Sequence, residues 1–229
     1  VEVLKQVETP KRIAFSPDLS VVSMEKEIAE VCRGATKVFK DMGAEVTDEI
    51  PDFGGVLEAF QTLRAVLFAV MMEPILKQHR DRIAPEIVGN IERGLNISPS
   101  QIFEAERIRI ELFKRVLDFF ETHDFLVCPA ASIAPFPVDQ RYITEIDGKP
   151  CETYIDWFSI TFALTMTACP TISVPCGFTS EGLPVGVQIM GKPRGEAALL
   201  QVAKQFEQAI GISNKLPITP KTNLGNNSE

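Results

Sequence analysis

Nucleophilic catalysis by a side chain has few candidates in this sequence. A Ser–His–Asp triad needs a histidine as its base, and the chain contains only two, His79 and His123. His79 lies in a stretch of helical periodicity and His123 at the end of another, and such positions are more typical of surface or junction residues. The nucleophile motif G-x-S-x-G is absent from the sequence. We therefore assign no catalytic residue to a triad of this kind.

The sequence contains five cysteines: Cys32, Cys128, Cys151, Cys169 and Cys176. Their number is odd, their spacing is wide and no C-x-x-C pair occurs, which indicates reduced thiols in a cytoplasmic protein rather than a disulfide framework. Neither histidine lies near a cysteine in the sequence, so we expect no metal site. Cys128, Cys169 and Cys176 stand in apolar or proline-flanked stretches, where cysteine usually acts as a small buried residue.

Residues 186–192 read G-V-Q-I-M-G-K and match the first seven positions of a phosphate-binding loop. The eighth position should be Ser or Thr to hold magnesium, but it is Pro193. The residues between the two glycines are strand formers, whereas a phosphate loop needs a flexible backbone. We interpret residues 191–195 as a turn between a strand and a helix, and we expect no nucleotide and no other cofactor.

Two pairs of carboxylates lie close together in the sequence, Glu145 with Asp147 and Glu152 with Asp156. Such pairs could serve as acid and base, or could bind a cationic group. They lie in or beside a long loop, residues 130–150, and long loops in compact domains are often functional. The alternative is that these carboxylates are solvated charges on the surface of the loop, and we favour this explanation for both pairs.

The composition is that of a globular protein, with 229 residues of which 45% are hydrophobic and 24% charged. The net charge of −8 argues against a nucleic-acid or anionic membrane surface, because both need a basic patch. The longest uncharged run, residues 157–180, is interrupted by Pro170 and Pro175 and diluted by serines and threonines. There we expect a buried helix followed by a buried strand. No secretion signal or membrane span is expected, and the predicted location is the cytoplasm.

Apolar spacing predicts the elements of the first half of the chain. A strand over residues 11–19, a helix over 24–42 and a strand over 44–50 form a β-α-β unit. Two long helices follow, over residues 54–80 and 98–122. The first of these is rich in Met and Phe, which would also suit the wall of a ligand channel. We interpret it as a helix buried on most faces.

The second half of the chain alternates strands and helices. The expected elements are a buried strand over 125–128, a hairpin turn at 147–148, a helix over 154–168, strands over 171–174 and 185–190, and a helix over 196–208. The whole pattern predicts an α/β fold with a mixed sheet covered by helices on both faces. No linker interrupts it, so we expect one domain over residues 1–210 and a tail over 211–229.

The sequence of residues 165–191 resembles the C-terminal block of the amidase signature family, serine hydrolases that cleave carboxamides. Residues 165–178 read TMTACPTISVPCGF, where the family has a consensus sequence close to N-L-T-G-x-P-A-I-S-V-P-x-G-F. Residues 182–191 read GLPVGVQIMG, which is close to the consensus that follows in the family. The stretches DFLVCP at 124–129 and YIDW at 154–157 are also similar. Thr165 replaces a common Asn, and Ala168 with Cys169 replaces a Gly and a variable residue. These departures from the consensus concern the shape of the substrate pocket, and so the identity of the substrate. They do not concern membership of the family.

The resemblance implies a chemistry whose reacting groups are not in this sequence. The family uses a Ser nucleophile, a bridging Ser and a Lys base, all in a Gly/Ser-rich segment upstream of the matched block. No position here matches them, so no catalytic residue is assigned. Lys192 and Lys204 do not stand in the family's lysine context. The resemblance thus implies an incomplete amidase-type domain that needs a missing N-terminal half, with no metal and no cofactor.

What the resemblance implies for this chain is a part of the α/β core and one wall of the pocket for a small amide substrate. The candidate substrate-binding residues are Phe136, Tyr154, Asp156 and Trp157, for each of which plain packing is an equal alternative. The expected reaction cleaves a carboxamide C–N bond to a carboxylate and ammonia or an amine. A non-catalytic binding or scaffold module and an amidotransferase A-type subunit remain alternatives. A homo-oligomer is compatible with all three.

Overall fold

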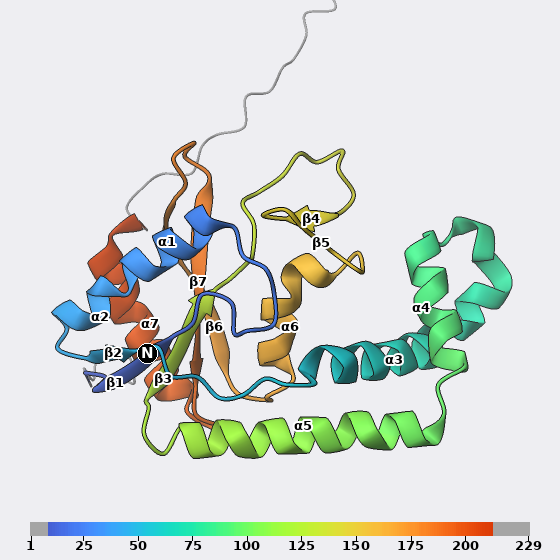
Figure 1. The fold of residues 1–229 in the computed structure, drawn as a ribbon, viewed down its shortest axis with the longest axis horizontal. Helices are drawn as coiled ribbons and strands as arrows, with labels where there is room; N and C mark the ends of the chain where they lie inside the picture. The colour runs from blue at the N-terminus through green and yellow to red at the C-terminus, as the bar shows by residue number, and fades with distance from the viewer. Residues whose placement is uncertain (1–8, 213–229) are drawn as a thin grey trace, which may run out of the picture.

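The computed structural model describes residues 9–212, and its centre is a five-stranded sheet with the strand order β2-β1-β3-β7-β6 (Figure 1). The strands are β1 (Arg12–Phe15), β2 (Glu45–Thr47), β3 (Phe125–Pro129), β6 (Thr171–Phe178) and β7 (Pro184–Gly191). β1 pairs in parallel with β2 and β3, whereas β7 pairs antiparallel with β3 and β6. The sheet is therefore mixed, as predicted. Of the predicted tail, residues 213–229 lie outside the described part of the chain.

Side chains that alternate along the strands separate two layers of core. On β1, Ile13 and Phe15 pack into one cluster and Ala14 into the other, and on β3 the neighbours Val127 and Leu126 divide in the same way. The first face is covered by α1 (Lys26–Ala35), α2 (Lys37–Asp41) and α7 (Glu196–Ile210), and the second by α3 (Val56–His79), α5 (Pro99–Phe119) and α6 (Ser159–Thr165). Helices on both faces were predicted, and this prediction is confirmed.

α3 and α5 extend together beyond the sheet to a small helical end, where α4 (Pro85–Leu95) packs against α3 (Figure 1). A separate apolar cluster around Leu76, Val88 and Ile91 holds this end together. The helices α3 and α4 cross with backbone contact at Gly94. A Cβ atom built there would lie 2.0 Å from the carbonyl oxygen of Ala65. Only glycine permits this approach.

The burial of α3 differs from the prediction. Leu67, Val70 and Met71 are exposed to 55%, 74% and 64% and form one apolar stripe. The interpretation of α3 as a helix buried on most faces was wrong, because its second half leaves the sheet behind and packs against α4. By length and composition alone, the segment Val56–Arg82 could cross a membrane. In this structure it packs against α4, α5 and α6.

The helix predicted over residues 24–42 is interrupted. The chain turns at Thr36, whose hydroxyl group donates to the carbonyl oxygen of Arg33 at 2.7 Å, and α2 begins one residue later. The helix predicted over 154–168 is a short 3-10 turn, η3 (Asp156–Phe158), followed by α6. In both cases a helical turn continues, but local hydrogen bonds tighten or break the α-helical ladder.

The hairpin turn predicted in the long loop is confirmed. It joins β4 (Glu145–Ile146) to β5 (Lys149–Pro150). Asp147 and Gly148 both have positive φ, 49° and 75°. Two such residues match the twist that an antiparallel hairpin needs, and Asp-Gly is a favoured pair for it. The hairpin places the following residues, 151–158, against α3.

Two glycines of α4 provide a matched test of the α3–α4 crossing. We expect Gly94→Ala to destabilise the protein by about 1–3 kcal/mol, because the added methyl group would force the two backbones apart. Gly89→Ala adds the same group to the same helix where no atom lies within 4 Å, and should stabilise by about 0.5–1 kcal/mol. Chemical denaturation followed by circular dichroism measures both free energies of unfolding. Equal effects of the two substitutions would contradict the crossing.

Candidate functional site

The residues predicted to bind substrate lie together around η3. The ring of Phe136, from the long loop, contacts the ring of Trp157 edge-on with 5.4 Å between centroids. The Trp157 indole N–H donates to the carbonyl oxygen of Tyr154 at 3.1 Å. Asp156 lies between Tyr154 and Trp157 in the sequence, at the first position of η3. The structure thus brings the four residues into one cluster, while substrate contact by any of them remains a prediction.

Asp156 shapes the backbone of this cluster. Its carboxylate accepts the backbone N–H groups of Glu152 at 2.7 Å and Thr153 at 2.8 Å, and also the Thr153 hydroxyl group. A carboxylate that accepts several donors in this way is a loop-organising group. Asp156 also lines a cavity of about 500 Å³, so it can hold the loop and face a ligand together.

The Tyr154 hydroxyl group connects the cluster to the helical arm. Its oxygen accepts an N–H of Arg64 from α3 at 2.5 Å and an N–H of Asn90 from α4 at 2.6 Å. The Tyr154 ring also lies edge-on to Tyr142 of the long loop. Sequence reasoning missed Arg64 and Asn90. One signal for the first was available, since Arg64 is the one charged residue between Glu58 and Glu73 in the sequence.

A second, larger cavity of about 780 Å³ lies beside β6. The residues that depart from the family wording, Thr165, Ala168 and Cys169, line it, together with Ser173 and the buried Gln188. Ala168 has a φ of 54°, in the left-handed region. A glycine there, as in the family wording, would adopt this backbone without strain. The departures therefore lie on the wall of a cavity, where they change its shape.

The outer side of β6 carries no neighbouring strand within the described part of the sheet. Along an antiparallel pair, backbone groups of alternate residues face the same neighbour. The N–H of Gly191 donates to the carbonyl oxygen of Pro170 at 3.0 Å, so the backbone groups of Thr171 and Ser173 face outward. The expectation of a buried strand at 171–174 was wrong, since Thr171 and Ser173 are exposed and only Val174 is buried in that stretch. β6 is an eight-residue edge strand without a charged side chain.

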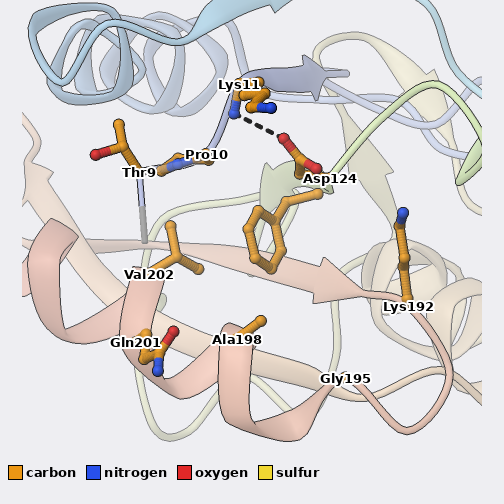
Figure 2. A pocket seen from close by; sticks show the side chains of 10 residues that line it. Thr9, Pro10, Lys11, Asp124, Lys192, Gly195, Ala198, Gln201 and Val202 are labelled. Carbon is orange, nitrogen blue, oxygen red and sulfur yellow. Dashed lines mark hydrogen bonds between the residues drawn. The ribbon is translucent and has the colours of Figure 1, made fainter. Parts of the chain in front are cut away.

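The segment that resembled a phosphate loop is strand β7, and its backbone pairs with β3 and β6. Lys192, which follows it, lines a third cavity of about 350 Å³ with Lys11 and Asp124 (Figure 2). The Asp124 carboxylate accepts the backbone N–H groups of Lys11 at 2.7 Å and Arg12 at 3.0 Å. Asp124 thus fixes the start of β1 beside β3, which is a structural role.

His123 and the buried thiols of Cys32 and Cys128 do not form a base with an activated nucleophile. The ring nitrogens of His123 interact with Thr47 and Thr122 at 3.1 and 3.0 Å, inside the protein. Burial raises the pKa of Cys128, and the hydrogen bond with Cys176 and burial raise the pKa of Cys32. Raised thiol pKa values disfavour the nucleophilic thiolate. Within residues 9–212, no group of three or more His, Cys, Asp and Glu side chains is arranged to hold a metal ion.

Comparison with known proteins identifies relatives over most of the chain. The family model Amidase matches residues 2–200. The acylamidase of Rhodococcus erythropolis is 27% identical over 209 residues, which are 90% of this chain and 44% of that protein. The A-type subunit of the glutamyl-tRNA(Gln) amidotransferase of Thermodesulfovibrio yellowstonii is 38% identical over 236 residues, covering 90% and 46%.

Solved structures agree with this result at the level of the fold. A bacterial aryl acylamidase of the amidase signature family superimposes with a TM-score of 0.80 at 24% identity, over 95% of this chain and 48% of that one. A 6-aminohexanoate cyclic dimer hydrolase also gives 0.80, at 20% identity, over 94% and 48%. This chain spans about half the length of the curated relatives it matches. With a family model that matches nearly its whole length, the chain belongs to the amidase signature family.

Proposed function

We propose that this chain forms the C-terminal part of an amidase, which cleaves a carboxamide C–N bond to a carboxylate and ammonia or an amine. Membership of the family supports the reaction class. The chain's share of its relatives' length, about half, supports a partial contribution. The observation that carries the proposal is the uncharged open edge of β6 with a large cavity beside it.

The open edge supports a partner polypeptide that continues the sheet. Edge strands of complete domains are usually short, charged, bulged or covered. The second half of β6 carries a proline and a bulge, at Pro175 and Gly177, but its first half offers the outward backbone groups of Thr171 and Ser173 between uncharged side chains. A register shift between Pro175 and Gly177 ends the regular stretch. A strand from the half that holds the nucleophile would pair there. The cavity of about 780 Å³ would then lie between the two halves.

In this arrangement the chain supplies residues that bind the amide substrate and form a wall of its pocket, and the partner half supplies the reacting groups. A Ser hydroxyl group activated by a neutral Lys would attack the amide carbonyl, and backbone N–H groups would hold the oxyanion. Phe136, Tyr154, Asp156 and Trp157 would form a wall for the small-molecule amide. We propose that the chemistry needs neither a metal nor a cofactor, and that the protein acts in the cytoplasm.

A second candidate is an amidotransferase A-type subunit. The observation that favours it is the 38% identity to the Thermodesulfovibrio yellowstonii protein over 90% of this chain. The altered turn at Thr165–Cys169 distinguishes this chain from the common family wording and favours a general amidase. Hydrolysis of simple amides by the complete protein would support the first candidate. Amidation of glutamyl-tRNA(Gln) that requires further subunits would support the second.

The first test compares the chain alone with the chain expressed beside a polypeptide that supplies the N-terminal half of the family's domain, called here the upstream polypeptide. We expect the chain alone to show no amide hydrolysis and no covalent adduct with a fluorophosphonate, because it lacks the Ser and Lys of the family. Together the two polypeptides should hydrolyse an aryl amide, with the adduct on the upstream one. Intact-mass spectrometry locates the adduct. An adduct on this chain would refute the division of roles.

The second test concerns the edge of β6. Ser173→Pro removes an N–H that faces outward, so the melting temperature of the chain should stay unchanged while association with the upstream polypeptide is lost. Ile172→Pro is the matched control. It removes an N–H bonded to β7 and should destabilise the chain itself by about 1 kcal/mol or more. Calorimetry and size-exclusion chromatography measure the two effects. Full association of the Ser173→Pro chain would argue against pairing at this edge.

A further inference from the structure

Gln188, on β7, presents an amide group to the cavity of about 780 Å³ beside β6. Its side chain lines that cavity although the residue is only 7% exposed. The amide nitrogen Nε2 donates to the carbonyl oxygen of Pro129 at 3.1 Å and lies 3.9 Å from the sulfur of Cys128. An acceptor at Pro129 fixes which end of the amide is nitrogen. The carbonyl oxygen Oε1 is therefore the end that points away from Pro129.

The Gln188 oxygen has no hydrogen-bond partner in the described part of the chain. It is not sealed off, however. Among residues 9–212, the side-chain nitrogen and oxygen atoms that are both unpaired and shielded from solvent belong to Arg12, Arg64 and Arg115. Space accessible to a ligand therefore reaches Oε1. A buried amide oxygen is costly to leave unpaired, so a donor that enters the cavity gains from pairing with it.

Three threonines that line the same cavity have already used their hydroxyl protons. Thr161 and Thr165, one turn apart on α6, donate to the carbonyl oxygens of residues 130 and 161, each at 3.2 Å. Thr171 donates to the carbonyl oxygen of Cys169 at 3.4 Å. A hydroxyl group that has donated its proton keeps its oxygen lone pairs. These side chains therefore offer the cavity further acceptors and no donors.

Ser173 lies directly opposite Gln188 on the neighbouring strand β6, and it lines the cavity as well. Opposite residues of an antiparallel pair point to the same face of the sheet. This pair is of the kind without mutual backbone hydrogen bonds, in which the side chains approach more closely. The Ser173 hydroxyl group makes no hydrogen bond within residues 9–212. Its oxygen and Gln188 Oε1 are thus two neighbouring acceptors.

The cavity carries no net formal charge within the described residues. Arg194 and Glu196, one of each sign and both exposed, are the charged residues that line it. Apolar side chains such as Phe113 and Leu164 form other parts of the wall. Neutral acceptors repel a carboxylate, and an ammonium ion leaving water would need a negative partner to offset its desolvation. A neutral NH2 group, which has two N–H donors, matches two neighbouring acceptors.

We propose that Gln188 Oε1 and Ser173 Oγ accept the two N–H groups of an unsubstituted carboxamide in this cavity. The substrate class is then a primary amide. Its hydrolysis takes up one water molecule, breaks the C–N bond and releases ammonia, not an amine. This inference rests on the proposed amidase function, which makes the bound amide a substrate and places the cavity beside the half that supplies the reacting groups. The pair of acceptors itself belongs to this chain alone.

The test is a binding measurement on the 229-residue chain with three ligands of nearly equal shape. Benzamide carries the NH2 group, acetophenone has a methyl group in its place, and benzoate has a negative oxygen there. Each is titrated in the millimolar range, at constant ionic strength, while NMR spectra of the isotope-labelled chain are recorded. We expect saturable shifts of the Thr171 and Ser173 backbone amides with benzamide, and about fivefold weaker binding of the other two ligands.

Three outcomes of this titration would overturn the proposal. They are equal affinity for benzamide and acetophenone, a preference for benzoate, and no saturable shift with benzamide. A preference for benzoate would show that donors such as Arg194 dominate the cavity, not acceptors.

Substitutions locate the acceptors. Ser173→Ala should weaken benzamide binding about twofold to fivefold and leave acetophenone binding unchanged, because only benzamide has N–H groups to lose a partner. Gln188→Met removes the other acceptor and should abolish the preference for benzamide. Ser180→Ala is the matched control, since Ser180 is exposed in the turn of the same hairpin and does not line this cavity. Unchanged benzamide binding by the Ser173→Ala chain, or equal weakening of both ligands, would refute the assigned role. Ser173→Ala keeps the test decisive if Gln188→Met unfolds.

The two proposals fail in different ways. If the chain binds benzamide through Ser173 but the complex with the upstream polypeptide hydrolyses no amide, the acceptor site stands and the amidase function fails. If the complex hydrolyses amides while Ser173→Ala changes neither benzamide binding nor the KM for benzamide, the function stands and this inference fails. Faster hydrolysis of N-methylbenzamide than of benzamide would contradict the substrate class. Melting temperatures of all variants check that each one folds.

Discussion

The pairing of β3 on both sides holds the structure together. Every residue of this strand is buried, and it pairs in parallel with β1 and antiparallel with β7. Its alternating side chains enter both core layers, so helices from distant parts of the chain pack against one strand. Asp124, directly before it, accepts two backbone N–H groups from the start of β1. Loss of this strand would separate the β-α-β unit from the β6–β7 hairpin, whose sequence resembles the family consensus.

Local patterns predicted most of the fold. The strand at residues 125–128, the hairpin turn at 147–148 and the helix over 196–208 follow from short-range chemistry, which acts in the same way in any fold. The exposure of α3 and the open edge of β6 could not be predicted in this way. An apolar stripe has the same periodicity whether or not another element covers it, and the covering element is a property of the whole assembly.

The candidate site was predicted in part, for a similar reason. Phe136, Tyr154, Asp156 and Trp157 come from one loop region, so a local resemblance could point to all of them. Arg64 and Asn90 reach Tyr154 from 90 and 64 residues away, and no local motif marks them. Their approach depends on the crossing of α3 and α4 at Gly94. A single residue without a side chain thus brings together the groups that surround the Tyr154 hydroxyl.

The open edge of β6 also has a consequence for recognition. Backbone N–H and C=O groups are the same in every strand, so they give an edge affinity without telling one partner from another. The information that selects the correct strand must then come from side chains beside the edge. In this chain those are the residues of the adjoining cavity, including Thr165, Ala168 and Cys169. Under the proposed pairing with a second polypeptide, the positions that distinguish this sequence from the family consensus are thus the ones suited to select that polypeptide among related proteins.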